Sequence, residues 1–144
     1  MRKVLYVYGG PFHPSEEAGK VLAELLAADG HFALEATSEL NALATLNNTE
    51  YAAVVIYTTG FRDDLVPARE QGLLGFIRNG GGFVGIHSAS DSFRGNRNYI
   101  EMLGGEFQSH PPVHEFTVSI VNHDHYLTTR MPDFTVVDEM YHLS

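Results

Sequence analysis

Short runs of apolar residues alternate along this chain with segments in which apolar side chains recur at helical spacing. The runs over residues 4–8 and 83–86 predict buried strands, and the continuous run 51–57 is typical of a parallel strand covered on both faces. Residues 32–36 alternate between apolar and polar positions, so we expect a strand at the edge of the sheet there. The pattern therefore predicts four strands in the first part of the chain.

The segments between these runs predict three helices. Ser15 is expected to cap the first helix, which carries acidic residues in its first turn and ends at Gly30. Leucines at helical spacing after Ser38 predict a shorter helix, and Pro67 suits the first turn of a third, which the glycines at 80–82 terminate. Strands and helices that alternate with short connections indicate an α/β fold with a mostly parallel sheet.

The pattern changes after Asp91. Residues 98–103 predict a short helix, and the alternating segments 116–121 and 134–137 predict two further strands. Neither a linker nor an internal repeat interrupts the chain. We therefore expect a single domain over residues 1–144.

Composition narrows the classes of function. The 144 residues, 44% of them hydrophobic, are enough for one domain with a buried core. A formal charge of −9 argues against nucleic acid as a partner, because phosphate binding needs a basic face. No apolar run reaches the roughly 18 residues of a membrane span, so we expect a soluble, cytoplasmic protein without a membrane partner. The absence of cysteine excludes disulfides, a thiolate nucleophile and cysteine-ligated zinc.

Polar side chains follow three of the predicted strands. In an open parallel sheet, ligands bind outside the carboxyl ends of the strands, near the point where the strand order reverses. If the strand order is 2-1-3-4, the loops after the first, third and fourth strands lie on one rim. These loops carry His13, Thr58, Thr59, His87, Ser88 and Asp91. One interpretation is a ligand site at this rim, and the other is a set of residues that only shape loops and cap turns.

The chain also contains eight histidines, most of them beside polar loops. His110 and His114 have the spacing of two metal ligands on a helix, but the two prolines between them exclude a regular helix. The alternation of His123 and His125 would place two imidazoles on one side of a strand. A divalent metal bound by histidines is one interpretation, and surface or hydrogen-bonding histidines are the other.

The candidates for acid/base chemistry are a histidine at a turn and a pair of acids. The sequence Gly-Ile-His-Ser-Ala around His87 has the form of a strand-to-helix elbow with the histidine at its apex. If Ser88 were a hydrolase nucleophile, the pattern G-x-S-x-G would need glycine in place of Ile86, so a serine hydrolase is a minor alternative. Histidine at an apex suits a general acid or base. Asp138 or Glu139 could orient a histidine or act as a base, or could mark an exposed strand end.

Several motifs spread over most of the chain form a specific combination. They are the glycine-rich segment 80–89, Tyr99 with residues 102–105 and Phe107, His110-Pro111, and residues 132–134 leading into 138–141. Together they resemble the ThuA-like (trehalose utilisation) family of the class I glutamine amidotransferase-like superfamily. The resemblance implies a flavodoxin-like three-layer sandwich whose nucleophile elbow, usually a cysteine, corresponds to His87. Because the chain has no cysteine, the thiol-dependent glutaminase reaction of the superfamily is excluded.

The resemblance also implies which residues form a pocket. That set is His13, His87, His110, Glu115, His125 and the motif Asp138-Glu139-x-Tyr141. Joining this set to the rim residues, we expect catalytic roles for His13, His87, His110 and Glu139. Substrate-binding roles are expected for Thr59, Ser88, Asp91, Glu115, His125, Asp138 and Tyr141. Where the family pattern has His-Pro, this chain has His125-Tyr126.

Two functions of different classes follow as hypotheses. The main one is an enzyme that uses a carbohydrate of the trehalose or keto-sugar type through histidine and carboxylate acid/base chemistry, without glutaminase activity. The alternatives are a non-catalytic module that binds a sugar or metabolite, and the serine hydrolase already described. No cofactor is indicated apart from the divalent metal that the histidines leave open, and a homo-oligomer is also left open. Because similar proteins continue beyond the Asp-Glu-x-Tyr motif, we expect the domain to be incomplete at its carboxyl end.

Overall fold

The computed structural model describes residues 1–62 and 64–144, which form two compact units. The amino-terminal unit is Met1–Glu106 and the carboxyl-terminal unit is Phe107–Ser144. Each unit contains its own strand pairings. The expectation of a single domain, incomplete at its carboxyl end, stays a prediction.

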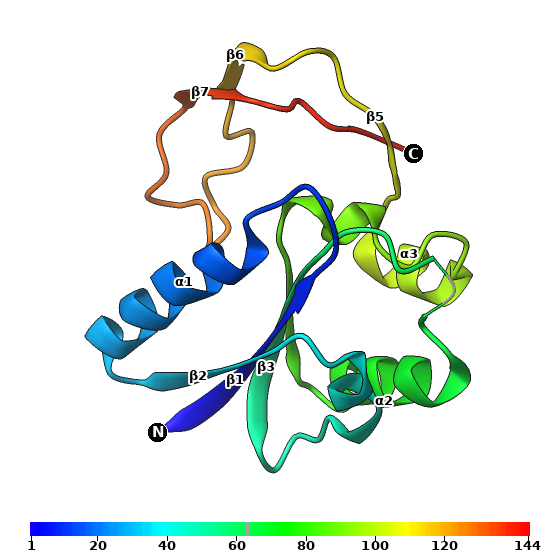
Figure 1. The fold of residues 1–144 in the computed structure, drawn as a ribbon. Helices are drawn as coiled ribbons and strands as arrows, with labels where there is room; N and C mark the ends of the chain where they lie inside the picture. Colours follow the sequence, from blue (N-terminus) through cyan, green and yellow to red (C-terminus); the bar gives the residue numbers. More distant parts are fainter. Residues whose placement is uncertain (63) are drawn as a thin grey trace. The chain divides into compact units, whose positions relative to one another are not determined.

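A four-stranded parallel sheet forms the centre of the amino-terminal unit (Figure 1). Its strand order is β2 (Phe32–Thr37), β1 (Arg2–Gly9), β3 (Tyr51–Thr58) and β4 (Gly82–Gly85), and every neighbouring pair is parallel. All four predicted strands are present, and β2 lies at the edge as predicted. The order 2-1-3-4 places the carboxyl ends of β1, β3 and β4 next to one another.

Helices cover both faces of this sheet (Figure 1). The helix α1 (Ser15–Asp29) packs on one face, and the 3₁₀ helix η1 (Leu40–Thr45) packs with α2 (Pro67–Arg78) on the other. The unit also contains the 3₁₀ helix η2 (His87–Asp91) and the short helix α3 (Arg97–Leu103). Among the helices of the described residues, none is both long and apolar enough to cross a bilayer. The three layers confirm the predicted flavodoxin-like α/β sandwich.

Alternate side chains of the central strands enter two separate cores, because successive residues of a strand point to opposite faces. Leu5 and Val7 of β1 pack with the helices of one face, and Val4 and Tyr6 pack with α1 on the other. The second contact is close at Gly19 of α1, where a Cβ atom would lie 2.5 Å from Cε1 of Tyr6. A glycine at this position therefore allows α1 to approach the sheet.

The start of α1 and the form of the next helix differ from the predictions. The prediction that Ser15 caps α1 is wrong, because Pro14 is the N-cap residue and no side chain caps this helix. The Ala18 N–H donates to the Pro14 carbonyl at 3.0 Å, so helical hydrogen bonding starts one residue earlier than the polar pattern indicates. The segment after Ser38 is helical as predicted, but it forms a 3₁₀ helix of 6 residues.

The carboxyl-terminal unit contains two antiparallel strand pairs. In one pair β6 (His114–Val118) lies beside β7 (Phe134–Asp138), and in the other β5 (Phe107–Ser109) lies beside β8 (His142–Leu143). The two strands predicted in this region correspond to β6 and β7, but β6 lies earlier in the sequence than expected. Neither β5 nor β8 was predicted, because segments of 3 and 2 residues carry no readable periodic pattern.

Candidate active site

Three loops meet at the carboxyl end of the parallel sheet. The loop after β1 carries His13, the loop after β3 begins with Thr59, and β4 leads into His87. The Thr59 N–H donates to the Gly9 carbonyl at 3.1 Å and so ties two of these loops together. The predicted rim is therefore formed, because the strand order brings three distant chain segments to one edge of the sheet.

The imidazole rings of His13 and His87 lie next to each other at this rim. Their centroids are 4.7 Å apart and their planes make an angle of 76°, which is an edge-to-face arrangement. The ring of Tyr57 lies 6.1 Å from that of His13 and 6.3 Å from that of His87. Both histidines are half-buried. The structure thus brings together two of the predicted catalytic residues within the amino-terminal unit.

A short chain of hydrogen bonds orients the ring of His13. Its Nδ1 lies 2.7 Å from Oγ1 of Thr59, and Thr59 Oγ1 donates to Oγ of Ser88 at 2.8 Å. A hydroxyl has one proton to donate, and that of Thr59 is used by Ser88. His13 must therefore donate from Nδ1, which leaves the lone pair of the neutral ring on Nε2. In this tautomer Nε2 is the nitrogen that can act as a general base.

His87 occupies a strained position between β4 and η2. Its backbone φ is +45°, in the left-handed region that residues with a side chain rarely adopt. The strand ends at Gly85, where a Cβ would lie 3.2 Å from the Cβ of Ala89, and η2 begins at His87 after the single residue Ile86. The predicted strand-to-helix turn around His87 is thus present. Such a turn presents the side chain at its apex beyond the end of the sheet.

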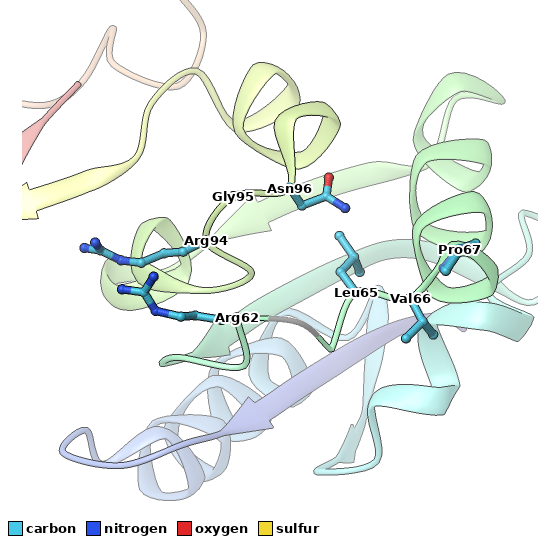
Figure 2. A pocket seen from close by; sticks show the side chains of 7 residues that line it. All are labelled: Arg62, Leu65, Val66, Pro67, Arg94, Gly95 and Asn96. Atoms are coloured by element: carbon cyan, nitrogen blue, oxygen red, sulfur yellow. The ribbon is translucent and has the colours of Figure 1, made fainter.

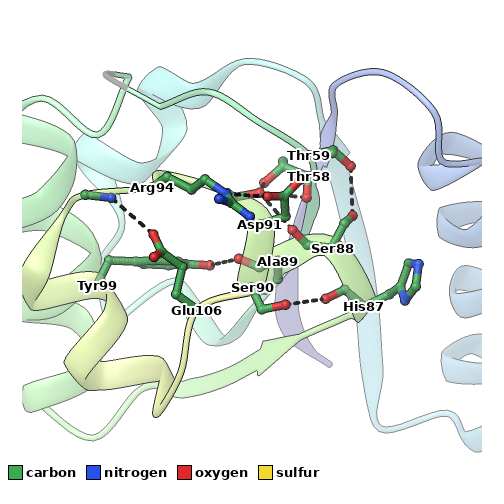
Figure 3. Close-up of polar contacts among 12 residues, drawn as sticks. Thr58, Thr59, His87, Ser88, Ala89, Ser90, Asp91, Arg94, Tyr99 and Glu106 are labelled. Carbon is green, nitrogen blue, oxygen red and sulfur yellow. Dashed lines mark hydrogen bonds and ion pairs between the residues drawn. The ribbon is translucent and has the colours of Figure 1, made fainter. Parts of the chain in front are cut away.

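Buried hydroxyl groups fix η2 against β3 (Figure 3). The Ser92 hydroxyl donates to the Thr58 carbonyl at 2.6 Å, and its oxygen lies 2.7 Å from Oγ1 of Thr58. The Tyr99 hydroxyl donates to the Ala89 carbonyl at 2.9 Å, and burial raises the pKa of Tyr99 above its ordinary value. Sequence reasoning did not find Ser92, because a serine in a polar loop carries no local signal of burial. These contacts hold the turn that positions His87.

Two predicted substrate-binding residues of η2 are engaged with the protein itself. Ser88 is fully buried and accepts the hydrogen bond from Thr59. Asp91 accepts a hydrogen bond from Nε of Arg94 in a partly buried ion pair. The Gly60 N–H also donates to the Asp91 carbonyl at 3.3 Å. Both residues therefore support the loops of the rim.

A second group of predicted residues lies together in the carboxyl-terminal unit. Nε2 of His110 is 3.5 Å from a carboxylate oxygen of Glu139, and the ring of His110 stacks with that of Tyr141 at a centroid distance of 6.0 Å. The Tyr141 ring also contacts Phe107, with centroids 4.3 Å apart. Nδ1 of His110 lies 2.8 Å from the Pro111 carbonyl, so this nitrogen donates. Three of the predicted residues therefore form one cluster in this unit.

The remaining predicted residues of this unit lie elsewhere on it. Glu115 is exposed on β6 opposite Val137. The Asp138 carboxylate accepts a hydrogen bond from the Glu139 N–H at 2.8 Å, at the end of β7. His125 is exposed, and its Nδ1 accepts from the Leu127 N–H.

The prediction that His123 and His125 share one side of a strand is wrong. The chain between β6 and β7 forms bends and turns at these positions. The Thr128 N–H donates to the His125 carbonyl at 2.9 Å, which closes a turn there. Local turn bonding therefore overrides the alternation that favoured a strand.

Comparison with known proteins places the chain in a family. Residues 3–144 match the family described as ThuA, trehalose utilisation. The chain belongs to this family. Its fold is similar to that of a ThuA-like protein from Bacteroides uniformis ATCC 8492, with a TM-score of 0.77, 23% identity, and coverage of 99% of this chain and 61% of that one. A ThuA-like protein from Parabacteroides merdae ATCC 43184 gives a TM-score of 0.81 at 19% identity, with 97% and 62% coverage.

At 23% and 19% identity, the two solved structures establish the fold of the ThuA family member and not its reaction. The chain spans about three fifths of the length of these structures, at 61% and 62%. No curated protein matches it.

The histidine pair also bears on metal binding by this ThuA family member. Neutral imidazoles are common ligands of divalent metals, so His13 and His87 could supply two of them. Catalytic zinc sites use three protein ligands, so a metal at this rim would need a further donor. The pair by itself is suited to proton transfer.

Proposed function

We propose that this chain carries out acid/base chemistry on a carbohydrate, with His13 and His87 as the catalytic residues. The observation that carries the proposal is the edge-to-face pair of imidazoles at the rim of the sheet, 4.7 Å between centroids. Ligands of open α/β sheets bind at this end of the strands. The substrate class rests on the family description, trehalose utilisation, and is a sugar of the trehalose type or its keto derivative.

Two imidazoles can share acid/base catalysis, in which one accepts a proton and the other donates one. The unprotonated Nε2 of His13 accepts a proton from the carbon next to the keto group of a keto sugar. The C–O bond at the following carbon then breaks, and a protonated His87 gives its proton to the oxygen that leaves, so that an unsaturated keto sugar and an alcohol form. His87 is placed for this role by its position at the apex of the turn, and His13 is oriented by Thr59.

The buried position of Ser88 weighs against a serine hydrolase. Its side chain is 0% exposed, and its oxygen accepts the hydrogen bond from Thr59. A nucleophile must present its oxygen to the substrate, whereas Ser88 points into the packed interior between η2 and the loop after β3 (Figure 3).

The roles of His110 and Glu139 are proposed separately. Nε2 of His110 lies 3.5 Å from a carboxylate oxygen of Glu139 in the carboxyl-terminal unit, and this contact could orient the ring or pass a proton. The variant Glu139→Gln keeps the shape of the side chain and removes its charge. A fall in turnover with unchanged folding would support a catalytic role for this pair.

The acid/base proposal is tested by comparing turnover and binding in matched histidine variants. The protein is assayed with trehalose and 3-ketotrehalose, and sugar binding is measured by calorimetry. We expect His87→Ala and His13→Ala each to lower turnover by about 10²–10⁴-fold, the usual contribution of a general acid or base. The control is His31→Ala, since the His31 side chain is 78% exposed and its ring contacts Asp29, away from the rim.

Three outcomes separate the hypotheses. Loss of turnover in both rim variants, with binding retained and His31→Ala active, supports the acid/base roles. Full turnover in His87→Ala overturns them. Sugar binding by the wild-type protein without turnover of either substrate identifies the chain as a binding module instead.

A further inference from the structure

A pocket of about 370 Å³ opens in the amino-terminal unit beside the start of α2 (Figure 2). Its lining comes from the loop after β3, the start of α2 and the loop after η2. The lining residues are Arg62, Leu65, Val66, Pro67, Arg94, Gly95 and Asn96. This volume lies within the range of about 300–1,000 Å³ that small-molecule sites occupy. No predicted site residue lines it.

Two arginines, Arg62 and Arg94, line this pocket. The guanidinium groups of Arg62 and Arg94 extend in the same direction in Figure 2. Nε of Arg94 donates to the carboxylate of Asp91, which fixes the plane of that guanidinium. Arg62 has no ion-pair partner among residues 1–62 and 64–144. Arg62 therefore adds a positive charge that no described carboxylate neutralises.

The other polar lining group is already occupied. Oδ1 of Asn96 accepts from the Tyr99 N–H at 2.9 Å, and its Nδ2 donates to Glu70 at 2.7 Å. Hydrogen bonds from Asn96 and Asn98 lower the pKa of Glu70, so this carboxylate stays ionised while both its oxygens are engaged. The arginines are thus the groups that would recognise a ligand, opposite an apolar wall of Leu65, Val66 and Pro67.

We infer that this pocket binds the oxyanionic group of a small molecule, a phosphate or a carboxylate. A guanidinium presents a planar fork of N–H donors that matches the oxygens of both groups. The apolar wall would contact the uncharged part of the ligand. Pockets that combine apolar walls with a few fixed polar groups are typical small-molecule sites.

Two loops contribute residues both to this pocket and to the histidine rim. Thr59 and Arg62 lie on the loop after β3, and His87 and Arg94 lie at and just beyond η2. The Phe93 N–H donates to the Gly60 carbonyl at 2.9 Å, which joins these loops between the two sites. The oxyanion site does not depend on the acid/base proposal.

Calorimetry at low ionic strength tests the oxyanion site, with inorganic phosphate, glucose 6-phosphate, glucuronate and uncharged glucose as probes. We expect binding of a charged probe by the wild-type protein and a loss of at least about tenfold in affinity in Arg62→Gln, since charged hydrogen bonds of this kind are lost. Binding only of the phosphates, or only of glucuronate, identifies which oxyanion the site takes. The matched control is Arg97→Gln, because Arg97 is exposed and pairs with Glu101 outside the pocket.

Nuclear magnetic resonance locates the binding and keeps the test independent of turnover. The amide signals of Leu65 and Gly95 should shift on addition of the charged probe, while that of Gly19, in α1, should not. His87→Ala should bind the probe as the wild type does, so failure of the acid/base proposal leaves this result unchanged. Absence of binding by every charged probe, or equal loss of affinity in Arg62→Gln and Arg97→Gln, overturns the inference.

Discussion

Nδ1 of His13 and Oγ1 of Thr59 lie 2.7 Å apart, and this contact joins the loop after β1 to the loop after β3. Because the Thr59 hydroxyl donates its hydrogen bond to Ser88, Nδ1 of His13 must be the donor in this contact, which fixes the tautomer of the neutral ring. Thr59 is therefore a positioning residue for a proposed base.

Replacing Thr59 by valine should remove the hydrogen bond that orients the ring of His13. The change keeps the shape of the buried side chain but removes the hydroxyl, so we expect turnover to fall by about tenfold, the value of one hydrogen bond to a catalytic group. The ¹⁵N shifts of the His13 ring should also show a larger share of the other neutral tautomer. Thr59→Ser should restore both properties, and an unchanged tautomer in Thr59→Val would disprove the positioning role.

The backbone conformation of His87 predicts that glycine at this position gives a more stable protein than alanine, although both substitutions abolish activity. Glycine adopts a φ of +45° without strain, whereas alanine does not, so His87→Gly should be more stable than His87→Ala by about 1 kcal/mol. Both variants lack the imidazole and should be equally inactive. Thermal unfolding of the two proteins checks the difference, and equal stabilities would show that the turn relaxes when the side chain is removed.

Two glycines in helices should respond in opposite ways to alanine. A Cβ on Gly19 would lie 2.5 Å from the ring of Tyr6, so Gly19→Ala should destabilise the protein by about 1–3 kcal/mol through overpacking. A Cβ on Gly75 of α2 would meet no atom within 4 Å, so Gly75→Ala should stabilise it by about 0.5–1 kcal/mol. Urea unfolding measures both changes. Similar effects of the two substitutions would contradict the close packing of α1.

Burial of Tyr6 predicts a loss of stability in alkali. Burial raises the pKa of Tyr6 from 10.0 to about 12 in the folded protein. The unfolded chain then releases this proton at lower pH than the folded protein does, so stability should be full below pH 10 and fall between about pH 10 and 12. The fall measured by urea unfolding should be smaller in Tyr6→Phe. The same pH dependence in both proteins would exclude this cause.

Local pattern was sufficient for most of the amino-terminal unit. Continuous apolar runs identified β1 and β3, because strands buried on both faces need apolar side chains at every position. The apolar run 83–86 also identified β4, but this strand lies at the edge of the sheet and Val84 is 49% exposed, so the expectation that it is buried was wrong. Pro67 and the glycines at 80–82 correctly bracketed α2. The turn at His87 was also predicted, from the apolar strand that stops at a His-Ser pair, although a strand ending in a plain polar loop was an equally good interpretation.

The two shortest strands and two local details of the chain were not predicted correctly, for physical reasons. The 3-residue β5 and the 2-residue β8 exist only because each pairs with the other across the chain, so neither segment shows a pattern alone. The strand suggested by His123 and His125 failed because local turn bonding fixes that region. Pro14 replaced Ser15 at the start of α1 because backbone geometry, and not a side-chain cap, begins that helix.

The sequence by itself determined the fold class, the family and the residue types available at the rim, because these depend on pattern and motif. Only the tertiary structure decided how they are used. It placed His13 next to His87, hydrogen-bonded His13 to Thr59 and buried Ser88. It also placed Arg62 and Arg94 in the lining of one pocket that no sequence motif predicted. The reason is that hydrogen bonds and charges between distant segments depend on strand order and loop contacts, which neighbouring residues do not record.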